Sequence, residues 1–403
     1  MQVSLCRTAA ALALALACSA ATALEDGRYL AILGDCAGCH TARGGPRFTG
    51  GRALNSPLGT FYTPNITPDR ETGIGSWSAD DFWRALHDGR SRSRGHLYPA
   101  MPYPHFATFT RAESDAIYAH LQTLAPVSSV PPGHEISFPL SMRFLLAIWN
   151  ALYLDREEYV PDPTKSARWN RGAYLVKGPA HCGDCHTPKN FLYANREDLA
   201  LSGNIVENWW AADLTSDDRE GLGTWSPADI VEYLKNGRNR HLMAAGPMVD
   251  VITVSTSQMR DGDLAAIAAY LKELPAVLEP HAVPAPAEST MSAGRAQFRK
   301  HCQDCHNYDG TGVPRRYQAL VGVPTVQARN PTTVLRVILE GQKPPAISAR
   351  PDDKPMPAFA EKMTDAEVAD VATYIRNAWG NRAAAVSARE VNDLREKLAA
   401  EDR

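Results

Sequence analysis

Six cysteines of this chain form three pairs with two residues between the partners, and a histidine directly follows each pair. The pairs are Cys36/Cys39, Cys182/Cys185 and Cys302/Cys305, and the histidines are His40, His186 and His306. C-x-x-C-H is the signature of haem c attachment. The two thiols add to the porphyrin vinyl groups, and the adjoining imidazole is the proximal ligand of the iron. The sequence therefore predicts three covalently attached haem c groups, each with its iron.

Paired cysteines can also form short disulfides or bind zinc. Neither use requires a histidine directly after the second cysteine, yet all three pairs have one. The other two cysteines, Cys6 and Cys18, lie in a leader that we expect to be removed, so no cysteine is left over. The pattern favours haem attachment over both alternatives.

A six-coordinate haem needs a second axial ligand, and a methionine thioether raises the reduction potential. Each haem unit should carry this methionine in the loop before its last helix. Met101 and Met356 each stand next to a proline in such a loop, and Met101 is the only methionine between the leader and Met142. Met363 opens a helix and is assigned to the core.

The middle unit offers Met243, Met248 and Met259. Met248 lies 63 residues after Cys185, and Met101 lies 62 residues after Cys39, so the matched spacing favours Met248. Met259 stands at a helix start and is assigned to packing. The predicted iron ligands are therefore His40 with Met101, His186 with Met248, and His306 with Met356.

The first two haem units repeat well beyond their motifs. Residues 65–78 match residues 213–226, and Trp77 and Trp225 lie 148 positions apart. Each tryptophan precedes a capped helix, with Ser78 and Ser226 as the expected caps. Such repetition at a long period indicates copies of one structural unit.

Each unit is expected to open and close with a helix. The opening helices contain Gly27, Gly172 and Gly294, and the closing helices span roughly 111–124, 261–274 and 364–379, with His120, Tyr270 and Tyr374 at matching positions. A glycine permits close approach of the two helices, so these rings are expected to pack against the opening helix. His120 could alternatively bind iron, and His181 and His301, which precede their cysteines, are expected near the surface or beside the site rather than in a redox role.

These features predict a mostly α chain of three tandem class I cytochrome c domains with proline-rich linkers. The expected order is a signal peptide (1–23), domain 1 (24–140), a connecting segment with an apolar helix (141–164), domain 2 (165–278), a linker (279–290), domain 3 (291–380) and a polar tail (381–403) that ends in an exposed helix.

The first residues have the pattern of a secretory signal, with Arg7 before an apolar stretch and a small-x-small end that predicts cleavage after Ala23. A retained N-terminal helix and a lipoprotein signal ending at Cys18 are the alternatives. Cleavage would leave 41 basic and 45 acidic residues, a balance that gives no reason to expect a nucleic-acid partner. The chain is therefore expected in the periplasm.

No later segment has the roughly 20 apolar residues of a membrane span. The most apolar one, residues 142–154, is interrupted by Arg143 and Asn150. The wider segment 138–154 is expected either as a helix buried between domains or as a docking face for a partner subunit or the bilayer surface. Membrane contact would then be peripheral, at the outer face of the cytoplasmic membrane.

With these motifs in place, the chain resembles the triple-haem cytochrome c subunits of membrane-bound bacterial dehydrogenases that act on alcohols, aldehydes, gluconate, sorbitol or fructose. The segments that carry the resemblance are GTFYTPNIT (59–67), HLYPAMPY (96–103), RGAYLV (171–176) and MPAF (356–359). The resemblance implies a catalytic partner of PQQ, flavin or molybdenum type, and passage of electrons to ubiquinone or a terminal oxidase. Similar subunits also serve molybdenum hydroxylases, and some carry a C-terminal membrane helix that this sequence lacks.

Two other function classes compete with electron transfer inside a complex. A peroxidase-like enzyme would need an open iron, and the candidate methionine in every unit argues against it. A small-ligand sensor or a free periplasmic shuttle would not need a fixed partner. No nucleotide fingerprint or nucleophile triad is evident, so the chain is expected to be an electron carrier and not an enzyme on its own.

Overall fold

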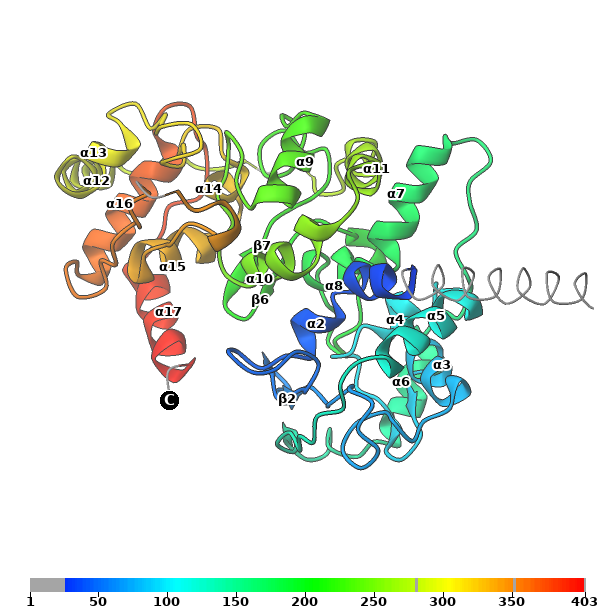
Figure 1. Cartoon of the computed structure of the whole chain (residues 1–403). Helices are drawn as coiled ribbons and strands as arrows, with labels where there is room; N and C mark the ends of the chain where they lie inside the picture. The colour runs from blue at the N-terminus through cyan, green and yellow to red at the C-terminus, as the bar shows by residue number, and fades with distance from the viewer. Residues whose placement is uncertain (1–25, 280–281, 351–352, 402–403) are drawn as a thin grey trace, which may run out of the picture. The chain divides into compact units, whose positions relative to one another are not determined.

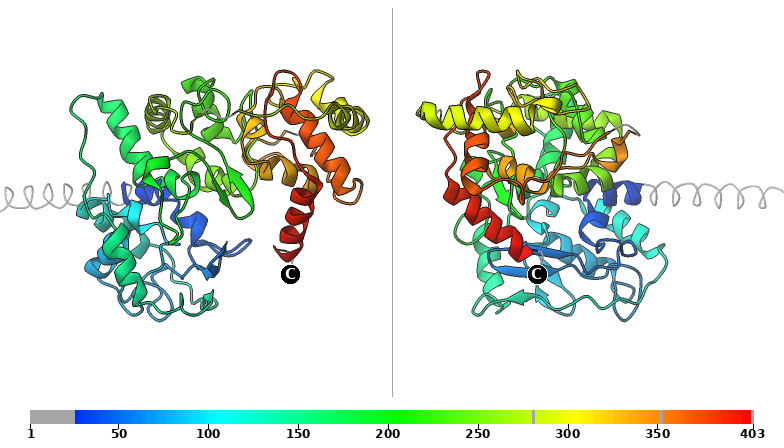
Figure 2. Two further views of the ribbon diagram at one scale, coloured as in Figure 1. Left: turned by 180° about the vertical axis from the view of Figure 1, so that it is seen from behind. Right: turned by 90° about the vertical axis from the view of Figure 1, so that its left-hand side faces the viewer.

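The computed structural model describes residues 26–279, 282–350 and 353–401, which form two compact units (Figures 1 and 2). Unit 1 extends to Pro161 and also contains Lys177–His181, and unit 2 contains Asp162–Val176 and everything from Cys182 onward. The predicted signal peptide with its cleavage point at Ala23 lies outside the described residues. The chain is mostly helical with short strands, which confirms the predicted fold class at that level.

Unit 1 contains the first C-x-x-C-H motif, and residues 26–33 form its opening helix. Three short strands pair antiparallel in the order β1-β2-β5, with Leu54 opposite Phe61 and Gly59 opposite Ile136. The further elements of unit 1 are α2 (Cys36–Cys39), β1 (Ala53–Ser56), β2 (Gly59–Tyr62), α3 (Ala79–His87), β3 (Arg90–Ser91), β4 (Gly95–His96), α4 (Tyr103–Phe106), α5 (Arg111–Gln122), β5 (Glu135–Ile136) and α6 (Leu145–Tyr153).

Unit 2 contains the second and third motifs. Its elements up to residue 272 are α7 (Ala167–Lys177, whose last residue is assigned to unit 1), α8 (Cys182–His186), η1 (Glu197–Leu199), β6 (Asn204–Val206), β7 (Trp209–Ala211), α9 (Pro227–Asn236), α10 (Pro247–Val254), η2 (Thr256–Gln258) and α11 (Asp261–Lys272). The remaining elements are α12 (Glu288–His301), α13 (Gln303–His306), α14 (Pro324–Gln327), α15 (Thr332–Glu340), η3 (Ala346–Ser348), α16 (Asp365–Asn377) and α17 (Ala388–Glu401). Helix α12 thus begins inside the predicted linker 279–290.

The same helix crossing occurs three times. A Cβ on Gly27, Gly172 or Gly294 would lie 2.0, 2.0 or 2.1 Å from a backbone carbonyl oxygen of α5, α11 or α16, respectively. The next neighbours of these positions include the Cβ atoms of His120, Tyr270 and Tyr374. Because only glycine permits such contact, the predicted role of the three glycines is confirmed. Each crossing fixes the helix that leads into a C-x-x-C-H motif.

The predicted helix starts are also confirmed. Ser78, Thr110, Ser226 and Thr364 each cap a helix, and in every case the acidic residue three positions later completes a capping box. The closing helices end two residues earlier than predicted, at Gln122, Lys272 and Asn377.

The prediction of an exposed helix in the tail 381–403 is wrong. Helix α17 packs against α15 and α16 (Figures 1 and 2). Val391, Leu394 and Leu398 are buried in the core of the third repeat. Their spacing of three and four residues places them on one face of a helix, which the polar composition of the tail conceals. Arg395 further anchors the helix by an ion pair with Asp365 at 2.7 Å.

Helix α6 is buried on one side and exposed on the other. Leu146 and Asn150 are buried, and the Asn150 side chain accepts a hydrogen bond of 2.6 Å from Tyr103 Oη. Phe144, Ile148 and Leu152 are 63, 56 and 63% exposed, and we call these three residues the α6 stripe. Across the described residues, no helix has the length and apolar character to cross a membrane.

Candidate cofactor sites

The three C-x-x-C-H motifs lie in short helical turns at α2, α8 and α13, each directly after an opening helix. None of the six motif cysteines, all of which lie within the described residues, is joined in a disulfide. Burial raises the pKa of Cys36, Cys182 and Cys302 to about 12. These three thiols are therefore protonated at neutral pH.

The three motif histidines share one hydrogen-bond geometry. The Nδ1 atoms of His40, His186 and His306 lie 2.8, 2.6 and 2.8 Å from the carbonyl oxygens of Pro64, Ala212 and Gln318. A carbonyl only accepts, so each Nδ1 carries the proton, and each Nε2 keeps its lone pair. Desolvation lowers the pKa of all three rings, which keeps them neutral. A neutral imidazole oriented by a backbone carbonyl is the form that binds a metal.

A second contact also repeats at each motif. The backbone N–H groups of Gly50, Gly203 and Gly312 donate to the carbonyl oxygens of the three motif histidines at 2.9, 2.8 and 3.0 Å. All three glycines have positive φ, at 73, 94 and 59°. In the first and third repeats, a glycine Cβ would lie 2.6 Å from the very carbonyl oxygen that accepts from the histidine Nδ1. The role of these glycines could not be predicted from the sequence, because their distance from the motif differs in each repeat.

The matched segments 65–78 and 213–226 begin directly after the acceptor residues Pro64 and Ala212. Asn65 and Asp213 are buried, and their side-chain oxygens accept from the backbone N–H two residues later, at 2.9 and 2.6 Å. These side chains fix the turn that carries the acceptor carbonyl. The sequence repeat thus serves to orient the motif histidines.

We predict that Gly312→Ala destabilises the third site. The added Cβ would meet the Tyr317 and Gln318 carbonyl oxygens at 2.4 and 2.6 Å and would displace the acceptor of His306. Gly322→Ala is the control, since Gly322 also has positive φ (69°) but its Cβ would meet nothing within 4 Å. Thermal unfolding should show a cost for Gly312→Ala about 1–3 kcal/mol larger than for Gly322→Ala. Equal costs would show that backbone strain alone is responsible.

The structure places Met101 and Met356 in loops, but Pro247 opens a helix directly before Met248, so the predicted loop position is wrong for the middle unit. Met101 is half-buried beside Tyr103 and Ala107, and Met356 pairs its backbone with Gln342. Met248 lies half-buried in the first turn of α10. Met259 is 1% exposed, in keeping with a packing role. Met243, from the middle repeat, lines the cavity at the third motif, a position that spacing alone did not reveal.

The third motif opens onto a cavity whose walls fit a haem. Cys302, Cys305 and His306 line it together with Met356. Apolar side chains cover most of the remainder, and they include Leu320, Val334, Val337, Ile338, Phe359 and Ile375. Arg316 and Lys354 also line the cavity and can neutralise the two porphyrin carboxylates. An apolar slot with thiols, an imidazole and a thioether suits a covalently bound haem.

The structure also places the three other histidines that were considered in the sequence. His120 stands at the helix crossing with Gly27, as expected for a packed ring. The rings of His181 and Phe106 form a T-shaped pair, with centroids 5.6 Å apart. His301 lines the third cavity and packs against Phe359, so it lies at the site itself.

Comparisons with known proteins agree with this chemistry. The family model for cytochrome c matches residues 291–379. The chain is 39% identical over 393 residues to a protein of Gluconacetobacter polyoxogenes that is named alcohol dehydrogenase (quinone), cytochrome c subunit. The alignment covers 93% of this chain and 84% of that protein. This chain is 36% identical to the gluconate 2-dehydrogenase cytochrome c subunit of Pantoea cypripedii, with 92% and 89% covered. It is also 41% identical to a nicotinate dehydrogenase subunit of Pseudomonas putida, with 89% of this chain but only 30% of that protein covered.

Proposed function

We propose that this chain, which belongs to the family of cytochrome c subunits of bacterial dehydrogenase complexes, passes electrons from a dehydrogenase partner through three covalently bound haems to ubiquinone or a terminal respiratory acceptor. The observation that carries the proposal is the histidine geometry that recurs at all three motifs. The family model itself covers only the third repeat, so the first two haems rest on this geometry. The fold that goes with it is three tandem cytochrome c domains.

The residues that would hold each haem follow from the repeats. The thioether bonds would form at Cys36 and Cys39, Cys182 and Cys185, and Cys302 and Cys305, and the axial pairs would be His40 with Met101, His186 with Met248, and His306 with Met356. Bound haem supplies one-electron redox chemistry. The chain's own groups fix each imidazole through Nδ1 and surround the third site with apolar side chains that exclude water.

The partner and the location are part of the proposal. The relatives are named as subunits of alcohol and gluconate dehydrogenases, which supports a dehydrogenase as the catalytic partner. We propose that this partner is of PQQ or flavin type, as the family resemblance implies. We place the chain in the periplasm, at the outer face of the cytoplasmic membrane. The α6 stripe supports a peripheral contact there with the membrane surface or with the partner.

A second candidate partner is a molybdenum hydroxylase. The specific observation in its favour is the 41% identity to the nicotinate dehydrogenase subunit. The cofactor of a co-purified partner would decide between the two, since molybdenum would favour this candidate and PQQ or flavin the first. In both cases the chain carries electrons and does not itself oxidise the substrate.

The intact mass of the purified protein tests the haem count and export together. We expect a chain that begins after Ala23 with three haem additions that survive denaturation, because thioether bonds are covalent. The double variant Cys182→Ala/Cys185→Ala should lose one haem and keep the other two. Fewer than three haems on the unaltered chain, matured in a host competent in haem attachment, would contradict the proposal.

A further inference from the structure

Part of the wall of the third cofactor site comes from the middle repeat. Leu242, Met243 and Ala245 line the cavity that contains Cys302, His306 and Met356. They belong to one segment after α9, which we call the wall segment (residues 242–245). The wall segment and the third motif lie in the same compact unit. The third site is therefore not built from residues of its own repeat alone.

A buried ion pair anchors the wall segment at its base. Arg238 Nη1 lies 2.9 Å from Asp353 Oδ2, and both side chains are only 4% exposed. The same guanidinium nitrogen donates to the Arg315 carbonyl oxygen at 3.1 Å. Arg238 precedes the wall segment by four residues, and Asp353 precedes Met356 by three. The pair thus ties the base of the wall segment to the base of the methionine loop.

Two glutamines tie the wall segment to both sides of the site. The Met243 backbone N–H donates to Gln318 Oε1 at 3.3 Å, and the Gln318 carbonyl oxygen accepts from His306. Gln342 Nε2 donates to the Ala244 carbonyl oxygen at 2.8 Å, and the Gln342 backbone pairs with Met356 at 3.1 and 2.8 Å. The wall segment is therefore bonded to the residue that orients the histidine and to the residue that holds the methionine.

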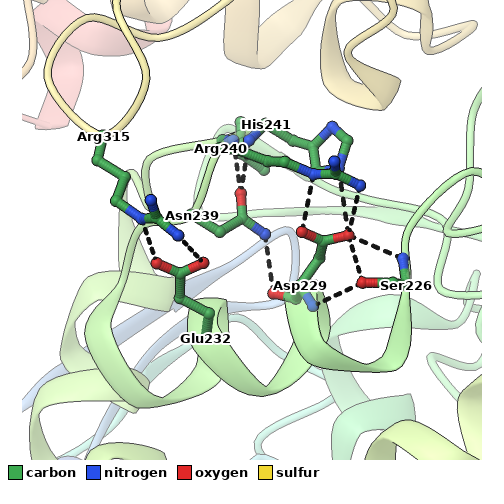
Figure 3. A network of polar contacts seen from close by, with 8 residues as sticks. Ser226, Asp229, Glu232, Asn239, Arg240, His241 and Arg315 are labelled. Atoms are coloured by element: carbon green, nitrogen blue, oxygen red, sulfur yellow. Dashed lines mark hydrogen bonds and ion pairs between the residues drawn. The ribbon is translucent and has the colours of Figure 1, made fainter.

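In two other ion pairs near this junction, the arginine side chain is exposed to solvent. Figure 3 shows Arg315 reaching the Glu232 carboxylate and Arg240 reaching Asp229, which also caps α9 through Ser226. The Arg315 and Arg240 side chains are 50 and 57% exposed. Exposed pairs contribute little to stability, whereas removal of one partner from a buried pair leaves an uncompensated charge. The Arg238–Asp353 pair is therefore the contact whose loss should move the wall segment.

We infer that Arg238 is a positioning residue for the third haem. Through Asp353 it holds the wall segment over the cavity, which shields the iron from small external ligands and keeps Met356 on it. The inference rests on the proposed function in that a haem occupies the third site with Met356 as its ligand. The C-x-x-C-H motif of this site lies in the third repeat, and the inference adds a structural role for a residue of the middle repeat.

The test uses the mature chain with its haems, the variant Arg238→Gln and carbon monoxide as the probe. We expect Arg238→Gln to keep three haems by mass, to bind carbon monoxide at one reduced haem, and to lower one reduction potential. Arg238→Lys, which keeps the charge, should bind much less carbon monoxide. Arg315→Gln is the matched control, since it removes only the exposed pair, and it should behave like the unaltered chain.

Asp353→Asn is the second variant if Arg238→Gln does not fold, and it should open the same haem. The inference would be overturned if Arg238→Gln left carbon monoxide binding and the reduction potentials unchanged. If Arg238→Gln does not fold, the same result in Asp353→Asn would overturn it. Equal opening in Arg315→Gln would also overturn it. Absence of the third haem from the unaltered chain would instead contradict the proposed function, so the two failures are distinguishable by mass.

Discussion

Replacement of Met248 by alanine is expected to open one haem of the reduced chain to carbon monoxide and to lower the reduction potential of that haem. Both effects follow from loss of a thioether ligand. The measurement is a carbon monoxide difference spectrum together with a redox titration. The effect should be confined to one of the three proposed haems.

The backbone of the first two repeats supports this choice of ligand. Arg90 pairs with His96 in the first repeat, and Arg238 pairs with Met243 in the second. The next residue in each case donates to a matching glycine carbonyl, at 2.7 Å for Leu97 to Gly89 and 2.8 Å for Ala244 to Gly237. Counted from His96 and Met243, the methionines Met101 and Met248 both stand five residues further along. The segments that lead to Met101 and Met248 are therefore in the same register at the proposed ligand.

Two other methionines serve as controls for this prediction. Met259→Ala removes a fully buried side chain and should cost about 2–5 kcal/mol of stability without opening a haem. Met243→Ala removes part of the wall segment at the third cavity, so any carbon monoxide that it admits should bind the third haem and not the middle one. Carbon monoxide binding at the middle haem by either control but not by Met248→Ala would show that the matched spacing identifies the wrong residue.

The sequence was sufficient for features with a local signature. The glycines at the helix crossings, the capping boxes and the motif histidines all follow from residue type and spacing. The acceptors of the histidine Nδ1 atoms could not be predicted, because they are backbone carbonyls 24, 26 and 12 residues away. Every residue has a backbone carbonyl, so the residue type does not identify the acceptor, and the loop lengths differ between repeats.

The junction around Arg238 has no local signature either. Its partner Asp353 is 115 residues away, in a different repeat. The buried face of α17 did have a signal, because Val391, Leu394 and Leu398 recur at helical spacing. The charged residues around these three positions led to the wrong prediction of an exposed helix. Helix α6 was expected either as a buried helix or as a docking face, and it has features of both. Leu146 and Asn150 are buried, whereas the α6 stripe is exposed to solvent.

The purified chain alone is expected not to be reduced by alcohols, sugars or aldehydes, and to be reduced rapidly once its dehydrogenase partner and that partner's substrate are added. Oxidation of such substrates removes two electrons, which a dedicated cofactor in the partner must accept. The measurement is the absorbance of reduced haem with and without the partner. Dithionite added to the lone chain is the control that its haems are competent. Substrate-dependent reduction without the partner would contradict the assignment as an electron carrier.

The same assay decides what the α6 stripe contacts. Ile148→Ser/Leu152→Ser removes apolar surface from residues that are 56 and 63% exposed, so the fold should be retained. Val130→Ser is the control, because Val130 is 83% exposed in the same compact unit but outside the stripe.

If the stripe docks on the dehydrogenase, the double variant is reduced more slowly in detergent solution while the control is not, since apolar area at an interface stabilises the complex. Unchanged reduction in detergent, combined with loss of binding to phospholipid vesicles, would assign the stripe to the membrane surface instead. Unchanged behaviour in both measurements would show that the stripe has neither role.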